Sequence, residues 1–385
     1  MKWSWFCRGC VLLLTGCIAH SSDYRITTFV PVDPAGFSNA LYQSTAVKLT
    51  PSHQVELINN GDVFDRIEQE VAKTQRSINI VIFIWRPGET SDRMVRAVTA
   101  RAKAGVACRI LVDHVGSLSF EDKVKPDLVA AGCDVRTFRK LRKGITDQRT
   151  HRKIVVLDGK AAFTGGFGIA DEWLGNGRTP KEWREANLFV QGPAVNELQQ
   201  AFADGWQEEN GPLLPESDFA AAPVEGATLA GFVTSVANDN LTRAERLTQL
   251  AIAAATRRIW ITNAYFVPSD GLIELLIEKR KQGVDVRVMV AGQETDHPLV
   301  LKLQRRTYKK LLEGGVRIWE YQPALLHSKT MVVDDHLSVV GSINLDRLSL
   351  EAMDEGSLVM SDPRVVNELV QYWESDIPHC VEQRQ

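Results

Sequence analysis

Residues 151–166 read HRKIVVLDGKAAFTGG, and residues 327–342 read HSKTMVVDDHLSVVGS. Both stretches follow the pattern His-x-Lys-x4-Asp-x6-Gly-[Gly/Ser]. In each, a histidine and a lysine two positions later lead into an apolar run that is typical of a buried strand. Because side chains at positions i and i+2 of a strand point to the same side, we expect each His–Lys pair to project together.

The similarity extends upstream of these two stretches. Residues 101–112 (RAKAGVACRILV) resemble residues 279–290 (KRKQGVDVRVMV), and residues 77–85 (SINIVIFIW) correspond to residues 258–266 (RIWITNAYF). A period of about 176 residues is far longer than the unit of a solenoid. The sequence therefore predicts two similar halves in one chain.

Each half alternates between apolar runs and amphipathic segments. We expect strands at 77–85 and 108–112 around a helix at 92–104, and strands at 260–266 and 286–290 around a helix at 271–282. This alternation predicts an α/β fold in which helices cover a mostly parallel sheet. The expected first half is 53–210, the second half is 229–385, and the Pro- and Ala-rich stretch 211–228 links them.

The overall composition is that of a folded protein. The 385 residues include 45 Lys+Arg and 48 Asp+Glu, with 44% hydrophobic and 24% charged residues. These values exclude a disulfide miniprotein, a disordered chain, a collagen and a polytopic membrane protein. The net charge of −3 argues against nucleic acid as the main partner, because domains that bind the phosphate backbone are usually basic.

The N-terminus resembles an export signal. Basic residues precede a short apolar centre, and Leu14-Thr15-Gly16-Cys17 matches the lipobox of bacterial lipoproteins. This interpretation predicts a signal peptide at 1–16, a lipidated Cys17, a tether at 17–52 and a position on a membrane of the bacterial cell envelope, facing the periplasm or the outside. An uncleaved anchor or a chance cysteine is the alternative. Removal of Lys2 and Arg8 with the signal would change the net charge to −5.

The paired His and Lys suit phosphoryl chemistry. An imidazole can attack phosphorus or donate a proton near neutral pH, and an ammonium neutralises phosphate oxygens. Two copies would supply a nucleophile and a general acid, His151 and His327, with Lys153 and Lys329 holding the phosphate. The backbone at Gly166 and Ser342 can approach an anion closely.

We expect neither a metal nor a cofactor, because the remaining histidines are scattered along the chain. Cys108, Cys133 and Cys380 have no metal-like spacing and are interpreted as buried apolar residues.

The two motifs resemble the double HKD signature of the phospholipase D superfamily, at His151/Lys153/Asp158 and His327/Lys329/Asp334. The similarity runs from about Leu57 to Tyr372, and the branch that matches best is bacterial cardiolipin synthase. The stretches that carry this branch resemblance are 83–86 (FIWR), 262–268 (TNAYFVP), 295–298 (TDHP), 320–323 (EYQP) and 341–346 (GSINLD).

This resemblance implies two phospholipase D-like α/β halves related by a pseudo-two-fold axis, with both motifs in one cleft between them. It makes His151 the nucleophile that forms a phosphohistidine and His327 the general acid, although near-symmetry leaves the reverse assignment open. Asn344 occupies the position that donates to the phosphate, and its first-half counterpart Gly168 departs from the usual Asn.

Two acidic residues fit the family positions that hold each histidine in the correct tautomer, Glu185 and Glu355. The alternative is that they are surface charges. Asp158 and Asp334 belong to the family motif, but their sequence context favours a structural role in the turns that close the strands.

Two further groups of residues, three tryptophans and a basic run, can each be interpreted in two ways. Trp85, Trp173 and Trp183 would either line a groove for lipid or belong to the core. The basic run of Arg139, Lys140, Arg142 and Lys143 before the first motif is either a solvated loop or a patch that attracts anionic lipid.

The function expected from these observations is phosphatidyl transfer on phospholipid phosphodiesters, with phosphatidylglycerol converted to cardiolipin and glycerol. If water is the acceptor, the same site is a phospholipase D that releases phosphatidic acid. A nuclease of the same superfamily and a non-catalytic lipoprotein scaffold are the further alternatives. The acidic net charge disfavours the nuclease, and the intact His and Lys of both motifs disfavour the scaffold.

Overall fold

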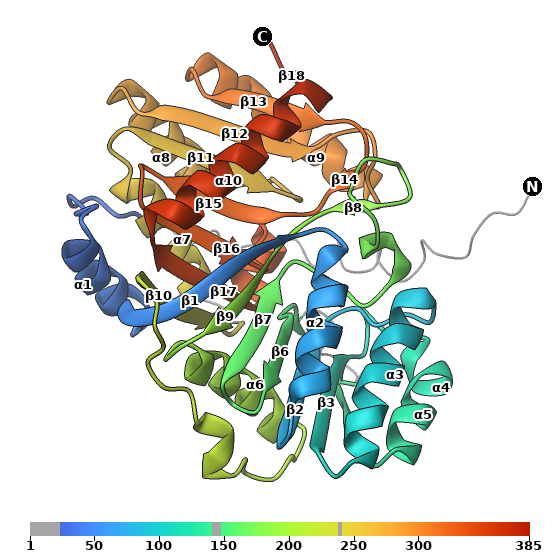
Figure 1. The fold of residues 1–385 in the computed structure, drawn as a ribbon. Helices are drawn as coiled ribbons and strands as arrows, with labels where there is room; N and C mark the ends of the chain where they lie inside the picture. The colour runs from blue at the N-terminus through green and yellow to red at the C-terminus, as the bar shows by residue number, and fades with distance from the viewer. Residues whose placement is uncertain (1–23, 141–147, 238–240) are drawn as a thin grey trace, which may run out of the picture.

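The computed structural model describes residues 24–140, 148–237 and 241–385 (Figure 1). After helix α1 (Pro34–Thr45), the first half contains β1 (Thr50–Asn59), α2 (Asp62–Lys73), β2 (Ser77–Ile82), α3 (Glu89–Lys103), β3 (Ala107–Asp113), α4 (Phe120–Lys123), α5 (Lys125–Ala130), β4 (Asp134–Phe138), β5 (Arg149–Thr150), β6 (Ile154–Leu157), β7 (Ala161–Gly165), β8 (Trp183–Arg184), β9 (Ala186–Gln191) and α6 (Val195–Glu208).

The second half repeats this order. It contains β10 (Thr228–Ser235), α7 (Arg243–Ala254), β11 (Arg258–Asn263), α8 (Asp270–Lys281), β12 (Asp285–Ala291), α9 (Pro298–Glu313), β13 (Arg317–Tyr321), β14 (Leu325–Leu326), β15 (Lys329–Val333), β16 (Leu337–Gly341), β17 (Met353–Ser361), α10 (Pro363–Asp376) and β18 (Cys380–Glu382).

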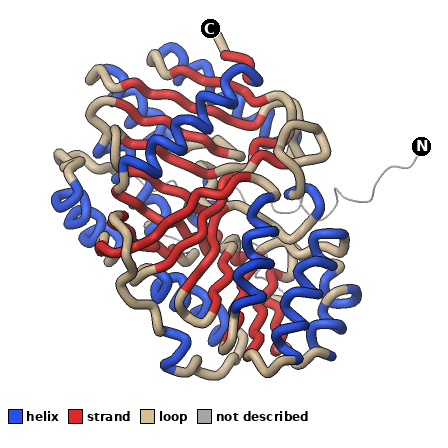
Figure 2. Tube along the Cα trace, in the orientation of Figure 1, coloured by secondary structure: helices blue, strands red, loops and turns tan. Residues whose placement is uncertain are grey.

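One continuous sheet joins the two halves (Figure 2). The strand order is β18-β13-β12-β11-β15-β16-β17-β10-β1-β9-β7-β6-β2-β3-β4. The antiparallel pair β1–β10 lies at the centre of this order. From β1 outward the strands are β9, β7, β6, β2, β3 and β4, and from β10 outward the corresponding strands are β17, β16, β15, β11, β12 and β13. Strand β18 is an addition at one edge. The internal repeat of the sequence is therefore a pseudo-two-fold repeat of the fold.

The expectation of a mostly parallel sheet is wrong. Among the described strands of the first half, β2–β3 and β3–β4 are the parallel pairs, whereas β6 pairs antiparallel with both β2 and β7. Asp158 and Gly159, at φ +53° and +62°, form the tight turn between β6 and β7. Such a turn joins antiparallel strands. The motif strand β6 therefore forms a hairpin with β7 and runs opposite to both of its neighbours in the sheet.

Helices cover both faces of the sheet (Figures 1 and 2). In the first half, α2 and α3 bury Phe64, Ile67 and Met94 against one face. In the second half α7, α8 and α9 have the equivalent place. Helices α6 and α10 share one apolar cluster with strands of both halves, so the two repeats have a common core.

The predicted tether is wrong over most of its described part. Helix α1 buries Phe37 and Leu41 completely in the core of the second half, and β1 begins at Thr50. The helix begins at the capping residue Asp33, whose side chain accepts from the backbone N–H of Gly36. Only two apolar residues of the helix, Phe37 and Leu41, are buried in this contact, which is too weak a pattern to recognise in the sequence.

Cys108 and Cys133 are both buried, as expected, but they are joined by a disulfide. The bond connects β3 to the turn before β4, and 25 residues separate the two cysteines in the sequence. Cys380 is a free thiol that donates to the carbonyl of Asp376, and it is half-buried, so its expected full burial is wrong. The spacing of the cysteines did not reveal the pair, because a parallel β3–β4 connection brings together residues on either side of an intervening helix.

We expect the double variant Cys108→Ser/Cys133→Ser to lose about 3.5 kcal/mol of unfolding free energy, because the chain-entropy relation gives this value for a loop of about 25 residues. Urea unfolding of the purified variant measures the loss, and Cys380→Ser is the matched control. Equal stability of the two variants would show that the bond does not restrict the unfolded chain.

Candidate active site

The two histidine motifs meet where the halves face each other. The backbone N–H of His151 donates to the carbonyl of Asp354 at 2.8 Å, and that of His327 donates to the carbonyl of Arg184 at 2.7 Å. The short strands β5 and β8 extend these contacts, because β5 pairs with β17 and β8 pairs with β14. Each motif is therefore attached to a segment of the other half.

The carboxylates that orient the histidines are exchanged between the halves. His151 Nδ1 lies 3.0 Å from Glu355 Oε1, and His327 Nδ1 lies 2.5 Å from Glu185 Oε2. Both glutamates are fully buried, so the alternative of surface charges is wrong. A carboxylate that accepts from Nδ1 leaves Nε2 as the reactive nitrogen of the ring. The sequence located the two glutamates but not the exchange.

Both lysines are buried beside their histidines. Lys153 Nζ donates to the carbonyl of His151 at 2.5 Å, and Lys329 Nζ lies 2.9 Å from His327 Nδ1. Burial lowers the pKa of Lys329 to about 8 and that of Lys153 well below its ordinary value. Charges of each motif also act on the other motif, since Lys153 and His151 contribute to the lowered pKa of His327. A bound phosphate anion would favour the charged form of both lysines.

The two His–Glu pairs differ electrostatically. Burial opposes ionisation of Glu355, but His151 and Lys153 and the hydroxyl of Ser342 lower its pKa below the ordinary value. Burial raises the pKa of Glu185 to about 7. Burial also lowers the pKa of His151 to about 4 and that of His327 well below its ordinary value. At neutral pH, Glu355 is therefore ionised beside a neutral His151, while Glu185 is partly protonated.

Different neighbours cause this difference. Ser342 and Ser349 both donate hydroxyl hydrogen bonds to Glu355. In the first half, Gly166 corresponds to Ser342 and Trp173 corresponds to Ser349. An added Cβ at Gly166 would lie 2.3 Å from Glu185 Oε1, so no hydroxyl fits there. The indole N–H of Trp173 donates to Glu185 at 3.2 Å. Ser342 and Gly166, which are predicted to approach the phosphate, contact the two carboxylates in this structure.

Asn344 and its first-half counterpart also differ. Asn344 is buried, and its side-chain oxygen has no hydrogen-bond partner among the described residues. At Gly168 an added Cβ would lie 2.8 Å from the ring of Trp173. The indole fills the space that an asparagine would need, so only the second half presents an amide here.

Asp158 and Asp334 lie away from this group. Each closes the turn at the far end of its motif strand and accepts backbone N–H groups at the start of a neighbouring strand, at 75–77 for Asp158 and 256–258 for Asp334. These contacts agree with the structural role that the sequence context favours, and they place both aspartates away from the buried histidines and lysines.

Aromatic rings surround the histidines. The ring of Trp183 lies 4.8 Å and that of Trp173 5.4 Å from His327, between centroids, and Trp85 is buried in the first-half core. Phe83 lies 5.0 Å from His151 and Tyr265 lies 6.1 Å from His327. Phe83 and Tyr265 lie in stretches 83–86 and 262–268 that carry the family resemblance, but the sequence predicts no place in the site for either ring; each follows the strand next to its motif strand.

Parts of two sequence predictions lie outside the described residues, namely Cys17 and the basic residues Arg142 and Lys143. The described part of the basic run makes ion pairs, Arg139 with Glu208 and Lys140 with Glu121.

Among residues 24–140, 148–237 and 241–385, no group of three His, Cys, Asp or Glu is arranged to hold a metal. No helix in that part of the chain is long and apolar enough to cross a membrane.

Comparison with known proteins places the chain in a family. It is 32% identical over 336 residues to a cardiolipin synthase of Geobacillus kaustophilus, covering 86% of this chain and 67% of the relative. It is 30% identical over 348 residues to the minor cardiolipin synthase of Bacillus subtilis, covering 89% and 85%.

A solved structure shares the fold. The phosphatidylserine synthase of Haemophilus influenzae superposes with a TM-score of 0.69 at 12% identity, covering 90% of this chain and 92% of that one. The family profile described as cardiolipin synthase, PLD-like domain, matches residues 67–206 and 249–377, which include both histidine motifs and both exchanged glutamates. The chain belongs to this cardiolipin synthase, phospholipase D-like family.

Proposed function

We propose that the protein is a phosphatidyltransferase that converts two molecules of phosphatidylglycerol to cardiolipin and glycerol. The observation that carries the proposal is the pair of buried histidines, each oriented by a glutamate of the other half and each accompanied by a lysine. This arrangement offers a nucleophile and a proton donor to the two sides of one phosphodiester. The names of the related cardiolipin synthases support the choice of lipid.

The first step forms a covalent intermediate. Nε2 of His151 attacks phosphorus, a P–N bond forms, and the P–O bond to the leaving glycerol breaks. His327 delivers a proton to the departing oxygen, so glycerol leaves as the neutral alcohol. Lys153 and Lys329 offset the negative charge that builds on the non-bridging oxygens, and the Asn344 amide donates to one of them.

The second step reverses these roles. The hydroxyl of a second phosphatidylglycerol loses its proton to His327 and attacks phosphorus, and the P–N bond to His151 breaks. Cardiolipin leaves, and the site returns to its starting protonation state. If water takes the place of the second lipid, the product is phosphatidic acid and the protein is a phospholipase D.

Incubation of the purified protein with radiolabelled phosphatidylglycerol, followed by lipid separation, tests the proposal. Diphosphatidylglycerol together with free glycerol is the expected result. Phosphatidic acid as the main product would assign the hydrolase, and an unchanged lipid would contradict both activities.

The pKa values predict a bell-shaped pH dependence of kcat/KM for a soluble short-chain substrate. The rate should rise as the pH passes about 4, because His151 becomes a neutral nucleophile there. It should fall above about 7, because the Glu185–His327 pair then loses the proton that the leaving alcohol needs. Glu185→Gln should move the falling limb to lower pH. An unchanged falling limb in that variant would show that the proton comes from elsewhere.

We further propose that the protein is a lipoprotein of the bacterial cell envelope, anchored through Cys17. The disulfide Cys108–Cys133 supports an oxidising compartment such as the periplasm or the cell surface. Cys17→Ser should abolish incorporation of labelled fatty acid and release the protein from the membrane fraction, whereas Cys380→Ser should do neither. Fatty acid retained in Cys17→Ser would contradict the anchor.

A further inference from the structure

Two leucines are unusually exposed on corresponding parts of the two halves. Leu118 follows β3 and is 66% exposed, and Leu299 follows β12 and is 49% exposed. Strands β3 and β12 have equivalent places in the repeated strand order. Both leucines therefore belong to segments that leave the carboxyl ends of equivalent strands.

Each leucine is one or two residues from a side chain that contacts the site. The hydroxyl of Ser117 donates to the carbonyl of Phe83, whose ring lies 5.0 Å from His151. The ring of His297 lies 5.5 Å from Tyr265, which lies 6.1 Å from His327. Leu118 and Leu299 are thus each close in the chain to a residue that touches an aromatic residue beside one of the histidines.

Positive charge continues from Leu299 along α9. Lys302 and Arg306 are exposed, and they follow Leu299 at the spacing that places residues on one face of a helix. Neither makes an ion pair with any described residue. An exposed leucine beside unpaired basic residues is typical of helices that lie on anionic membranes.

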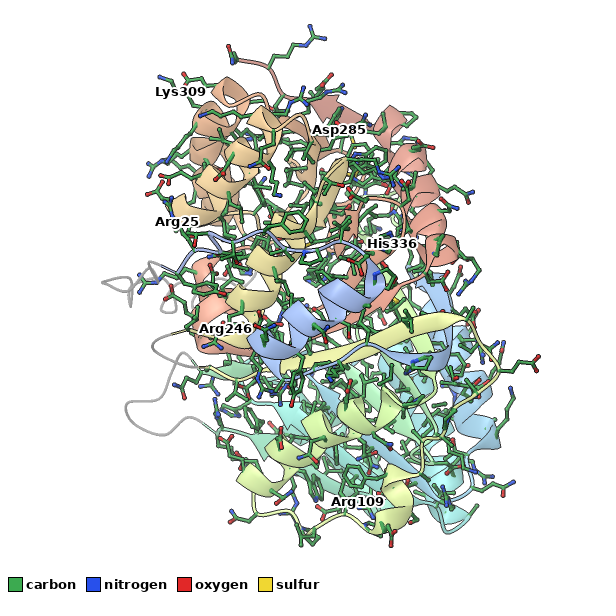
Figure 3. The ribbon with its side chains drawn as sticks, turned by 90° about the vertical axis from the view of Figure 1, so that its left-hand side faces the viewer. Arg25, Arg109, Arg246, Asp285, Lys309 and His336 are labelled. Atoms are coloured by element: carbon green, nitrogen blue, oxygen red, sulfur yellow. A yellow bond between two sulfur atoms is a disulfide. The ribbon has the colours of Figure 1, made fainter. Side chains whose placement is uncertain are left out.

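The N-terminal segment approaches the same end of the sheet. Arg25 forms an ion pair with Glu274 and lies 3.9 Å from the Cβ position of Gly271, in the first turn of α8. In Figure 3, Arg25 lies at the left-hand edge, whereas Arg109 and Asp285, near the starts of β3 and β12, and His336, in the β15–β16 turn, lie further to the right. Cys17 precedes Tyr24 by seven residues, which span at most about 25 Å.

We propose that Leu118, Leu299, Lys302 and Arg306 form a docking surface for a bilayer that contains anionic phospholipid. The leucines would enter the boundary between headgroups and acyl chains, and the basic residues would contact lipid phosphates. The proposal rests on the proposed function, because it brings a phosphodiester that resides in a bilayer to histidines that are themselves buried. A lipidated Cys17 would hold this surface toward the membrane.

Flotation with vesicles tests the surface independently of catalysis. The full chain carrying Cys17→Ser, so that no acyl chain contributes, is mixed with vesicles of phosphatidylcholine alone or with phosphatidylglycerol. Leu118→Glu and Leu299→Glu should each weaken binding about tenfold, because each removes the burial of one leucine. Lys302→Glu/Arg306→Glu should remove the preference for phosphatidylglycerol vesicles and the sensitivity of binding to salt.

The matched controls make the same Leu→Glu and Lys→Glu substitutions at exposed residues outside the proposed docking surface. Leu213→Glu replaces a leucine that is 79% exposed in the linker, and Lys160→Glu reverses an exposed charge at the β6–β7 turn. Both should bind vesicles like the Cys17→Ser parent. Equal binding by Leu118→Glu, Leu299→Glu and Leu213→Glu would overturn the proposal, as would a parent that does not bind phosphatidylglycerol vesicles.

Turnover of monomeric short-chain phosphatidylglycerol separates docking from chemistry. The docking variants should keep this turnover and lose turnover of the same headgroup in vesicles. If the protein turns over neither substrate but its vesicle binding still depends on the four residues, the docking surface is upheld and the proposed function is contradicted. Loss of both turnovers with normal vesicle binding would overturn the docking proposal.

Discussion

His151→Ala should abolish the conversion of phosphatidylglycerol to cardiolipin, and His327→Ala should reduce it by about 10²–10⁴-fold. The first change removes the atom that bonds to phosphorus, whereas the second removes a proton donor that water can replace inefficiently. Thin-layer separation of labelled lipids measures both rates. His379→Ala is the control, because this exposed histidine lies outside the site.

The same variants distinguish the two assignments of the nucleophile. With a substrate that carries labelled phosphorus, His327→Ala should accumulate a labelled phosphohistidine in denatured protein, and His151→Ala should not. Label retained by His151→Ala alone would exchange the roles of the two histidines. Full activity in either variant would contradict a mechanism that uses both.

Glu355→Gln should lower kcat by about 10²–10⁴-fold, by analogy with the loss seen when the carboxylate of a catalytic triad becomes an amide. The carboxylate accepts from Nδ1 of His151 and stabilises the positive charge that the ring acquires as it attacks phosphorus. An amide in the same place can donate to Nδ1 and so favour the wrong tautomer. Rapid-quench measurement should show slow formation of the phosphohistidine.

Glu355→Asp is the companion variant, because it keeps the charge and should recover part of the rate. Thermal unfolding of both variants checks that the buried network remains folded. Phosphohistidine formation at the normal rate in Glu355→Gln would show that the glutamate of the second half does not orient the histidine of the first.

The repeat itself was sufficient to predict two α/β halves and one paired site. It identified the four motif residues, and the resemblance to the phospholipase D superfamily added both glutamates. The strands at 77–82 and 107–113 and helix 89–103 also agree with the expected elements, because long apolar runs and amphipathic spacing are strong local signals.

Three features of the fold did not follow from local patterns. The mostly parallel sheet was a wrong expectation, since the direction of a strand depends on the turn that precedes it. The sequence predicts a tether where helix α1 lies, because this stretch shows little periodicity, although Phe37 is completely buried. The disulfide was missed because the distance between Cys108 and Cys133 in space is set by the path of the whole β3–β4 connection.

The sequence by itself determined which residues this protein would use, because the His-x-Lys frame repeats in both halves and its resemblance to the phospholipase D motif implies the two glutamates. Only the tertiary structure decided which residues act together. Glu355 serves His151 and Glu185 serves His327 because β5 and β8 pair with strands of the opposite half. Partnership across the pseudo-two-fold axis depends on long-range strand pairing, and no pattern within either half carries that information.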